Sequence, residues 1–337
     1  MKNVFNAAAA HIAPVYMDPL GTAKKAANWI EKARAQDIDL IVFPEVFIPG
    51  FPYWINCYPP LIQAELNRRY QDNSIEIGGP EIAVVQDAAR KAKCVVVIGI
   101  SERTVGGRTC YNSAVTINDD GEILCVHRKL MPTYAERYIW GMGDGSTLSV
   151  AESAIGRIGA LVCWEHTMNL ARQALAEQNL EIHAALWPGL STMAGFDQIA
   201  DIQIEAMMRN HALTAQCFVI SAASPVTQTM VDFLNNELGV QEFVKEGGGW
   251  SAIIQPFAAT IAGPHTGLDE KLVTAEIDLT QRNDAKLWVD TTGHYTRPDI
   301  LSLNFDQRQK TSFKTIKNNN SIDTLDLQNS ASDILTE

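Results

Sequence analysis

The chain has 337 residues, 46% of them hydrophobic, so it can bury a large core and fits one large α/β domain or two modest ones. Its formal net charge is −12 and its pI about 5.1, which disfavours nucleic acid and anionic membrane surfaces as partners. No apolar run approaches the roughly 20 residues of a membrane span, and the N-terminus has no signal-peptide pattern, so we expect a soluble, cytoplasmic protein.

The first half of the sequence alternates short apolar runs with amphipathic stretches, which is typical of β-α-β units. The pattern predicts strands over 4–12, 39–43 and 94–100, with helices over 23–35 and 80–93. A hairpin follows, because strands 112–118 and 123–129 flank Asp119-Asp120-Gly121, and Asp-Gly between alternating segments is a strong turn signal.

The second half repeats this rhythm. It predicts strands over 156–163, 182–187 and 217–222, helices over 169–177 and 199–213, and a second hairpin whose strands 250–262 and 271–277 flank the loop 263–267. Two such halves predict an α/β fold of four layers, an α-β-β-α sandwich with two sheets face to face and helices outside. We expect a single domain over 1–310 and a mobile polar tail over 311–337, where little apolar surface can offset the ordering entropy.

One of the six cysteines occupies a chemically favourable position. All six are scattered singly, without C-x-x-C spacing, so we interpret them as free thiols, most of them in the core. Cys163, however, ends the predicted strand 156–163 and directly precedes Trp164-Glu165-His166 and a helical segment. Backbone N–H groups and a helix dipole at such a junction lower a thiol pKa. Without activating neighbours, an ordinary core cysteine is the commoner alternative.

Two other reactive side chains also follow predicted strands. Glu45 comes after strand 39–43 and Pro44, and its apolar and aromatic neighbours would partly desolvate the carboxylate and raise its pKa toward that of a general base. Lys129 ends the hairpin strand 123–129. Singly, these residues could be an exposed loop acid and a solvated edge lysine. Together, a common sheet edge would bring a carboxylate, an ammonium and the Cys163 thiol to one place.

These three groups suit one type of reaction. Glu45 would remove the Cys163 proton, the thiolate would attack an electrophilic carbon, and Lys129 would stabilise negative charge on the attacked group. Such chemistry requires no metal and no organic cofactor. His166 is assigned a supporting role at most, because a side chain three residues along a turn can point away from the thiol and no matching metal-ligand partner exists.

Three separated motifs carry a family resemblance. Phe-Pro-Glu at 43–45, His-Arg-Lys at 127–129 and Cys-Trp-Glu at 163–165 resemble, in order, the signatures of the nitrilase or carbon–nitrogen hydrolase superfamily, over about 4–305. The segment that begins at Cys163 is similar to the nitrile-hydrolysing branch, whereas amidases and carbamoylases usually have an Asp-containing segment there. The resemblance implies hydrolysis of an organic nitrile to a carboxylic acid and ammonia through a thioimidate and a thioester on Cys163.

The resemblance also implies roles for further residues. Glu136 would be an additional catalytic glutamate that positions the substrate or water and holds Lys129; a surface acid paired with Arg137 is the alternative. The backbone N–H of Trp164 would contribute to an oxyanion-type hole. The substrate pocket would be shaped by Tyr53, Trp187 and Pro188.

Assembly and substrate remain open to several interpretations. Residues 293–299 resemble a segment associated with subunit assembly in nitrilases, so we expect a homodimer that builds a larger homo-oligomer such as a helical filament. The alternatives are a cyanide dihydratase, an amidase or carbamoylase on the same scaffold, a scaffold protein without catalysis, and a thiol-redox protein. The sequence does not set the class of nitrile or the ratio of acid to amide.

Overall fold

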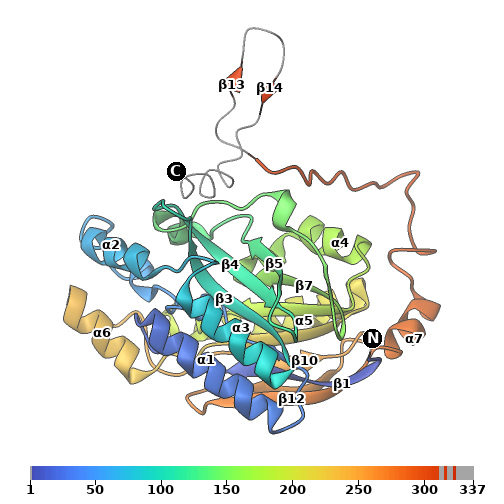
Figure 1. Ribbon diagram of the computed structural model, residues 1–337, viewed down its shortest axis with the longest axis horizontal. Coiled ribbons are helices and arrows are strands. Elements are labelled where there is room, and N and C mark those ends of the chain that lie inside the picture. The colour runs from blue at the N-terminus through green and yellow to red at the C-terminus, as the bar shows by residue number, and fades with distance from the viewer. Residues whose placement is uncertain (1, 311–314, 317–321, 324–337) are drawn as a thin grey trace, which may run out of the picture.

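The computed structural model describes residues 2–310, 315–316 and 322–323 (Figure 1). The predicted tail over 311–337 therefore lies outside the described residues, apart from two short antiparallel strands, β13 (Thr315–Ile316) and β14 (Ile322–Asp323). Within these ranges, no helix combines the length and the apolar character that a membrane crossing needs.

Two six-stranded sheets form the centre of the molecule. The first sheet has the order β12-β1-β2-β3-β4-β5, with bounds Lys271–Asp278, Val4–His11, Leu40–Val42, Val95–Arg103, Cys110–Ile117 and Ile123–Arg128. The second has the order β11-β10-β9-β8-β7-β6, with bounds Thr260–His265, Ser251–Ile254, Phe218–Ala223, Ile182–Trp187, Gly156–Val162 and Ala151–Ser153. In each sheet the inner strands β1-β2-β3 and β7-β8-β9 run parallel, so their carboxyl ends share an edge.

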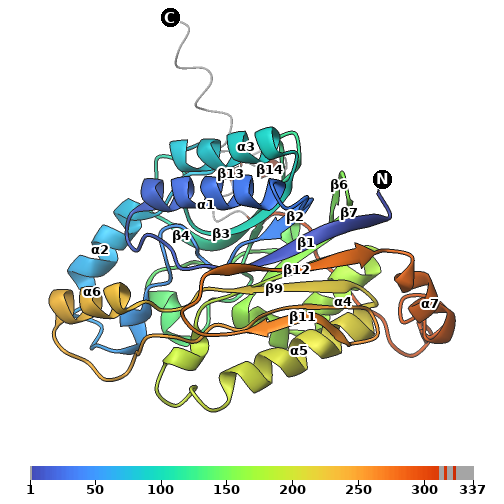
Figure 2. The same cartoon turned by 90° about the horizontal axis from the view of Figure 1, so that it is seen from below.

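Helices cover both outer faces, and Figure 2 shows α1 and α3 beyond the first sheet and α5 beyond the second. The expected four-layer α-β-β-α sandwich is therefore confirmed. The α-helices are α1 (Pro19–Arg34), α2 (Ala64–Asn73), α3 (Pro80–Ala92), α4 (Asn169–Glu177), α5 (Ala200–Ala215), α6 (Gln228–Leu238) and α7 (Gln281–Trp288). Of these, α2, α6 and α7 are absent from the sequence-based prediction.

The alternation of side chains explains why the strands are apolar on both faces. On β1, Ala7 and Ala9 pack between the sheets, whereas Ala8 and Ala10 pack in the cluster under α1 and α3. The continuous apolar run of β3 divides in the same way, since side chains of a strand alternate between its faces. The first sheet is thus fixed in register by two buried layers.

The predicted second hairpin is wrong. Strand β10 pairs with β11, and the chain reverses at residues 255–259, where the Gln255 N–H donates to the Ala259 carbonyl at 3.0 Å. Strand β12 crosses to the first sheet and pairs with β1 from Val4↔Asp278 to His11↔Lys271. The Gly-Pro-containing loop resembled a turn, but its first residues belong to β11 and the connection that follows joins the two sheets.

Candidate active site

Cys163 directly follows the parallel strand β7 and begins a short 3-10 helix, Cys163–Thr167. Its backbone has φ 54°, in the left-handed region that costs an L-residue about 1 kcal/mol or more. The sharp turn lets the buried strand end on a thiol instead of continuing past it. The prediction of a strand end at this cysteine is confirmed.

Glu45 follows β2, where the chain crosses over the neighbouring strand β3. The Phe43 N–H donates to the Val97 carbonyl at 2.7 Å, and the Ile48 N–H donates to that of Gly99 at 3.2 Å. A Cβ on Gly99 would lie 2.8 Å from the Glu45 Cα and 2.4 Å from the Pro44 carbonyl oxygen. The glycine within the apolar run therefore lets the Glu45 backbone lie directly on the sheet.

Lys129 follows β5 and is fully buried, with its N–H donating to the Asn112 carbonyl at 2.8 Å. Its Nζ donates to both carboxylate oxygens of Glu136, at 2.7 and 3.0 Å, and to Oε1 of Glu45 at 3.2 Å. Glu136 is itself buried, and its Oε2 accepts from the Thr133 N–H at 3.0 Å. Glu136 is thus an acid paired with Lys129 in the interior, not a surface acid paired with Arg137.

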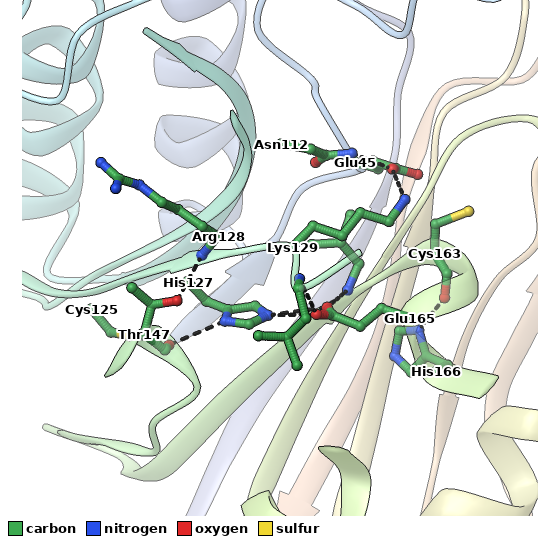
Figure 3. A network of polar contacts seen from close by, with 12 residues as sticks. Glu45, Asn112, Cys125, His127, Arg128, Lys129, Thr147, Cys163, Glu165 and His166 are labelled. Carbon is green, nitrogen blue, oxygen red and sulfur yellow. Dashed lines mark hydrogen bonds and ion pairs between the residues drawn. The ribbon is translucent and has the colours of Figure 1, made fainter. Parts of the chain in front are cut away.

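The four predicted catalytic side chains converge, and Figure 3 shows three of them, Glu45, Lys129 and Cys163. A carboxylate oxygen of Glu45, one of Glu136 and Sγ of Cys163 lie within 4.8 Å of one another, and Nζ of Lys129 donates to both carboxylates. Two carboxylates and a thiol are donor types that also bind metals. Here the Lys129 ammonium forms ion pairs with both carboxylates.

Burial sets the protonation states of this group. It raises the pKa of Glu45 to about 7, although the Lys129 ammonium opposes the shift. Burial would lower the pKa of Lys129, but the carboxylates of Glu136 and Glu45 outweigh it and hold that pKa above its usual range. Burial, followed by the charge of Glu45, also raises the pKa of the Cys163 thiol well above its ordinary value. The thiol is therefore protonated at rest, beside a Glu45 carboxylate whose pKa of about 7 is in the range of a general base.

The four residues expected at the pocket differ in how deeply they are buried. Tyr53 is buried and its hydroxyl oxygen accepts from the Gly189 N–H at 2.8 Å, directly after Pro188. Trp164 is half-buried and its ring lies 6.4 Å from that of Phe196. Trp187 is fully buried at the end of β8.

A comparison with known proteins places this geometry in a family. Residues 6–286 match the carbon–nitrogen hydrolase family model. The chain belongs to the carbon–nitrogen hydrolase family. It is 37% identical over 93% of its length, and 86% of the relative's, to an aliphatic nitrilase of Rhodococcus rhodochrous. It is also 35% identical to an arylacetonitrilase of Aspergillus kawachii, covering 90% of this chain and 92% of the relative.

Solved structures support the same fold. A carbon–nitrogen hydrolase from Helicobacter pylori superposes with a TM-score of 0.69 at 20% identity, covering 88% of this chain and 96% of that one. A nitrilase-superfamily protein of Saccharomyces cerevisiae gives a TM-score of 0.68 at 18% identity over 87% and 98% of the two chains. The resemblance seen in the three sequence motifs is confirmed.

Glu165, which the sequence analysis named only as part of the third motif, joins the two sheets of this carbon–nitrogen hydrolase. Glu165 accepts from the N–H of Leu130 at 2.7 Å and from the N–H of Val162 at 3.0 Å. These residues are the chain neighbours of Lys129 and Cys163. Its carboxylate also pairs with His127 Nε2 at 3.0 Å, and His127 lies on β5 of the other sheet (Figure 3). Glu165 therefore holds the lysine and cysteine turns at a fixed separation.

We expect Glu165→Gln to lower both activity and stability. The substitution breaks the buried pair with His127 and turns the glutamine NH2 toward a backbone N–H that needs an acceptor. Burial opposes ionisation of both groups, yet pairing lowers the pKa of Glu165 below 4.5 and raises that of His127 above 6.5. The stabilisation by Glu165 is lost as pH falls below 4.5 through its folded pKa, and that by His127 as pH rises above 6.5 through its own. The decrease in Tm should therefore be largest between pH 4.5 and 6.5, where the free energy of unfolding falls by about 3–5 kcal/mol.

Glu181→Gln is a matched control for this variant. Glu181 is a buried carboxylate that accepts from Arg157 and Arg282 and directly precedes β8, at the end of the strand opposite to the edge where Cys163 lies. The substitution should lower the Tm measured by thermal unfolding, whereas the protein that remains folded should keep the kcat of the wild type. Equal kcat values in the two folded variants would contradict a positioning role for Glu165.

Proposed function

We propose that this chain is a nitrilase that hydrolyses an organic nitrile to a carboxylic acid and ammonia, with Cys163 as nucleophile. The observation that carries the proposal is the convergence of the thiol with two carboxylates and a buried ammonium. The curated relatives named nitrilase and arylacetonitrilase, at 34–37% identity over about nine-tenths of the chain, support a nitrile as the substrate class.

The first half of the reaction forms a thioimidate. Glu45 takes the Cys163 proton and the thiolate attacks the nitrile carbon. One π bond of the C≡N group breaks, and its electrons become a lone pair on nitrogen. The nitrogen then receives that proton from Glu45, beside the Lys129 ammonium, and the Glu45 carboxylate is ionised again. The backbone N–H of Trp164 and the Lys129 ammonium stabilise the negative charge as it develops.

The second half of the reaction releases the products. Water, deprotonated by Glu45, adds to the thioimidate carbon to give a tetrahedral intermediate. Loss of ammonia leaves a thioester, which a second water hydrolyses to the acid and the free thiol. Loss of the thiol instead releases an amide, and a difference of about 1.4 kcal/mol between these barriers changes the product ratio tenfold. Glu136 holds Lys129 and orders the attacking water in this scheme.

Ammonia release from matched nitriles and amides tests the proposal. We expect kcat/KM for an aliphatic or arylacetonitrile to exceed that for the corresponding amide by at least about 10²-fold, since the site is then complementary to the thioimidate step. Comparable or faster turnover of the amide would contradict the proposal in favour of an amidase or carbamoylase. Turnover of cyanide alone would contradict it in favour of a cyanide dihydratase.

Substrate contacts are a separate part of the proposal. Tyr53, Trp164, Trp187 and Pro188 line the space above Cys163 in this interpretation and select for the substituent on the nitrile. Trp164 is the most exposed of the four, so its substitution is expected to change KM among nitriles of different size. The domain boundary at residue 310 stays a prediction.

Assembly and location complete the proposal. We propose a homodimer that builds a larger homo-oligomer or filament through the C-terminal region, where Trp288, Tyr295 and Leu301 are 77%, 73% and 76% exposed. Light scattering of the full chain and of a Trp288→Ala/Leu301→Ala variant measures this assembly. A cytoplasmic location accords with six free cysteines.

A further inference from the structure

Three buried histidines form a chain that begins at the nucleophile's own backbone. His166 Nδ1 lies 2.6 Å from the Cys163 carbonyl oxygen, and His166 Nε2 lies 2.9 Å from His183 Nε2. His183 lies on β8, and the ring of His211 from α5 packs edge-on against it at 4.2 Å. Trp187 stacks on the other side of His166 at 4.9 Å. All three histidines are fully buried.

The hydrogen bonds determine which nitrogen carries each proton. A carbonyl oxygen only accepts, so His166 Nδ1 must carry hydrogen and donate to Cys163. Burial lowers the pKa of His166 to about 4, so the ring is neutral and its Nε2 has a free lone pair. His183 Nε2 must then carry hydrogen and donate to His166. The Cys163 carbonyl therefore fixes the tautomer of His166, and the hydrogen bond from His183 holds the ring in place.

The acceptor at the end of this chain belongs to the peptide that joins Cys163 to Trp164. A trans peptide directs its C=O and N–H groups in opposite directions. When His166 holds the Cys163 carbonyl toward β8, the Trp164 N–H is directed to the opposite side. That N–H is the backbone group that favours the thiolate of Cys163. Because Cys163 has φ 54°, this peptide is held in a strained orientation that requires such a contact.

We propose that His166, held in place by the hydrogen bond from His183, is a positioning residue that aims the Trp164 N–H at the reacting sulfur and at the negative charge formed on the attacked group. His166 does not act on the thiol proton, since its nitrogens face the Cys163 carbonyl and His183. The catalytic part of this inference rests on the proposed function. The effect on the thiol itself does not.

Two amide substitutions at position 166 separate positioning from packing. The asparagine NH2 occupies about the place of histidine Nδ1, whereas the glutamine NH2 occupies about that of Nε2. If the hydrogen bond to Cys163 matters, His166→Asn keeps kcat within about tenfold and His166→Gln loses about 10²-fold, the loss typical of one misplaced transition-state donor. If only volume matters, the larger glutamine is the better replacement.

The pH dependence of Cys163 alkylation by iodoacetamide is the second readout. The titratable groups that face the sulfur are Glu45, Glu136, Lys129 and the Tyr53 hydroxyl, and they are unchanged in both variants. His166→Gln should move the midpoint of alkylation to higher pH by about one unit, while His166→Asn leaves it in place. This result is independent of nitrile turnover, so a wild-type chain inactive on nitriles would refute the proposed function without deciding the role of His166.

Substitution of His183 keeps the proposal testable if a variant at 166 does not fold. His183→Gln retains a donor near Nε2 and should resemble wild type. His183→Leu removes it, leaves Nε2 of His166 unpaired, and frees the ring to turn away from the Cys163 carbonyl, so it should show both the loss of kcat and the alkylation shift. Thermal unfolding checks each variant. Folded His166→Gln or His183→Leu with wild-type kcat and an unshifted alkylation midpoint would overturn the proposal.

Discussion

Replacing Cys163 by alanine should lower nitrile turnover by at least about 10³-fold in a protein that still folds. The thiol forms the covalent thioimidate, and no other cysteine has its sulfur within 4.8 Å of the Glu45 and Glu136 carboxylates in the described part of the chain. The remaining side chains cannot form the carbon–sulfur bond. Ammonia release measured beside circular dichroism tests this expectation.

Cys217→Ala is the matched control. Cys217 is equally buried, directly precedes β9, and has its pKa raised to about 12 by burial. Both substitutions remove the same sulfur from an apolar interior, so their costs in stability should be similar, on the order of 1 kcal/mol. Only the Cys163 variant should lose turnover. A folded Cys163→Ala protein that still releases ammonia from the nitrile would end the assignment of the nucleophile.

The active-site framework could be predicted because it obeys a rule that one sequence reveals. Strand β8 and helix α4 have the bounds that periodicity predicted, 182–187 and 169–177. Reactive residues in α/β sheets gather at the carboxyl ends of strands, so Glu45 and Cys163 could each be placed at such an end. The expected common sheet edge is wrong, because β2 and β7 belong to different sheets and the packing of the two sheets brings these residues together. Lys129 follows the hairpin strand β5 and joins them from the same sheet as Glu45.

The supporting contacts could not be predicted in this way, since they depend on how two sheets pack. Glu165 accepts from Leu130 and His127 across the sheet interface, and His183 meets His166 only because β7 and β8 are neighbours. A sequence pattern assigns each residue to an element but does not give the distance between side chains of different elements. The same limitation explains why His166 was expected to have only a minor role.

The wrong hairpin has a similar origin. The loop 263–267 contains the residues that usually mark a turn, whereas the actual turn at 255–259 relies on Ala258 at φ 64°. A non-glycine residue in that conformation gives no sequence signal. The partner of β12 is β1, and a pairing between the two ends of the chain is invisible to local pattern.

Glu45→Gln removes the proposed general base while keeping the hydrogen bonds around it. Oε1 of Glu45 accepts from Asn112 at 2.6 Å and from Lys129 at 3.2 Å, whereas Oε2 has no hydrogen-bond partner within the described residues. A glutamine can keep the accepting oxygen and place its NH2 at the unpartnered position. Lys129 also keeps both contacts with Glu136. The variant should therefore fold, unlike Lys129→Met, which would leave two buried carboxylates without a counter-charge.

Turnover by Glu45→Gln should fall about 10²–10⁴-fold, the usual contribution of a general base. Because Glu45 must be ionised to accept the thiol proton, kcat/KM of the wild type should rise with pH through about 7, and the residual activity of the variant should lack this limb. The folded pKa exceeds the ordinary 4.5, so the stability that the protonated carboxyl gives the wild type is lost as pH rises from 4.5 through about 7. The Tm of the variant, measured by calorimetry, should therefore rise relative to that of the wild type over this pH interval. An unchanged acid limb in the variant would assign the proton transfer to another group.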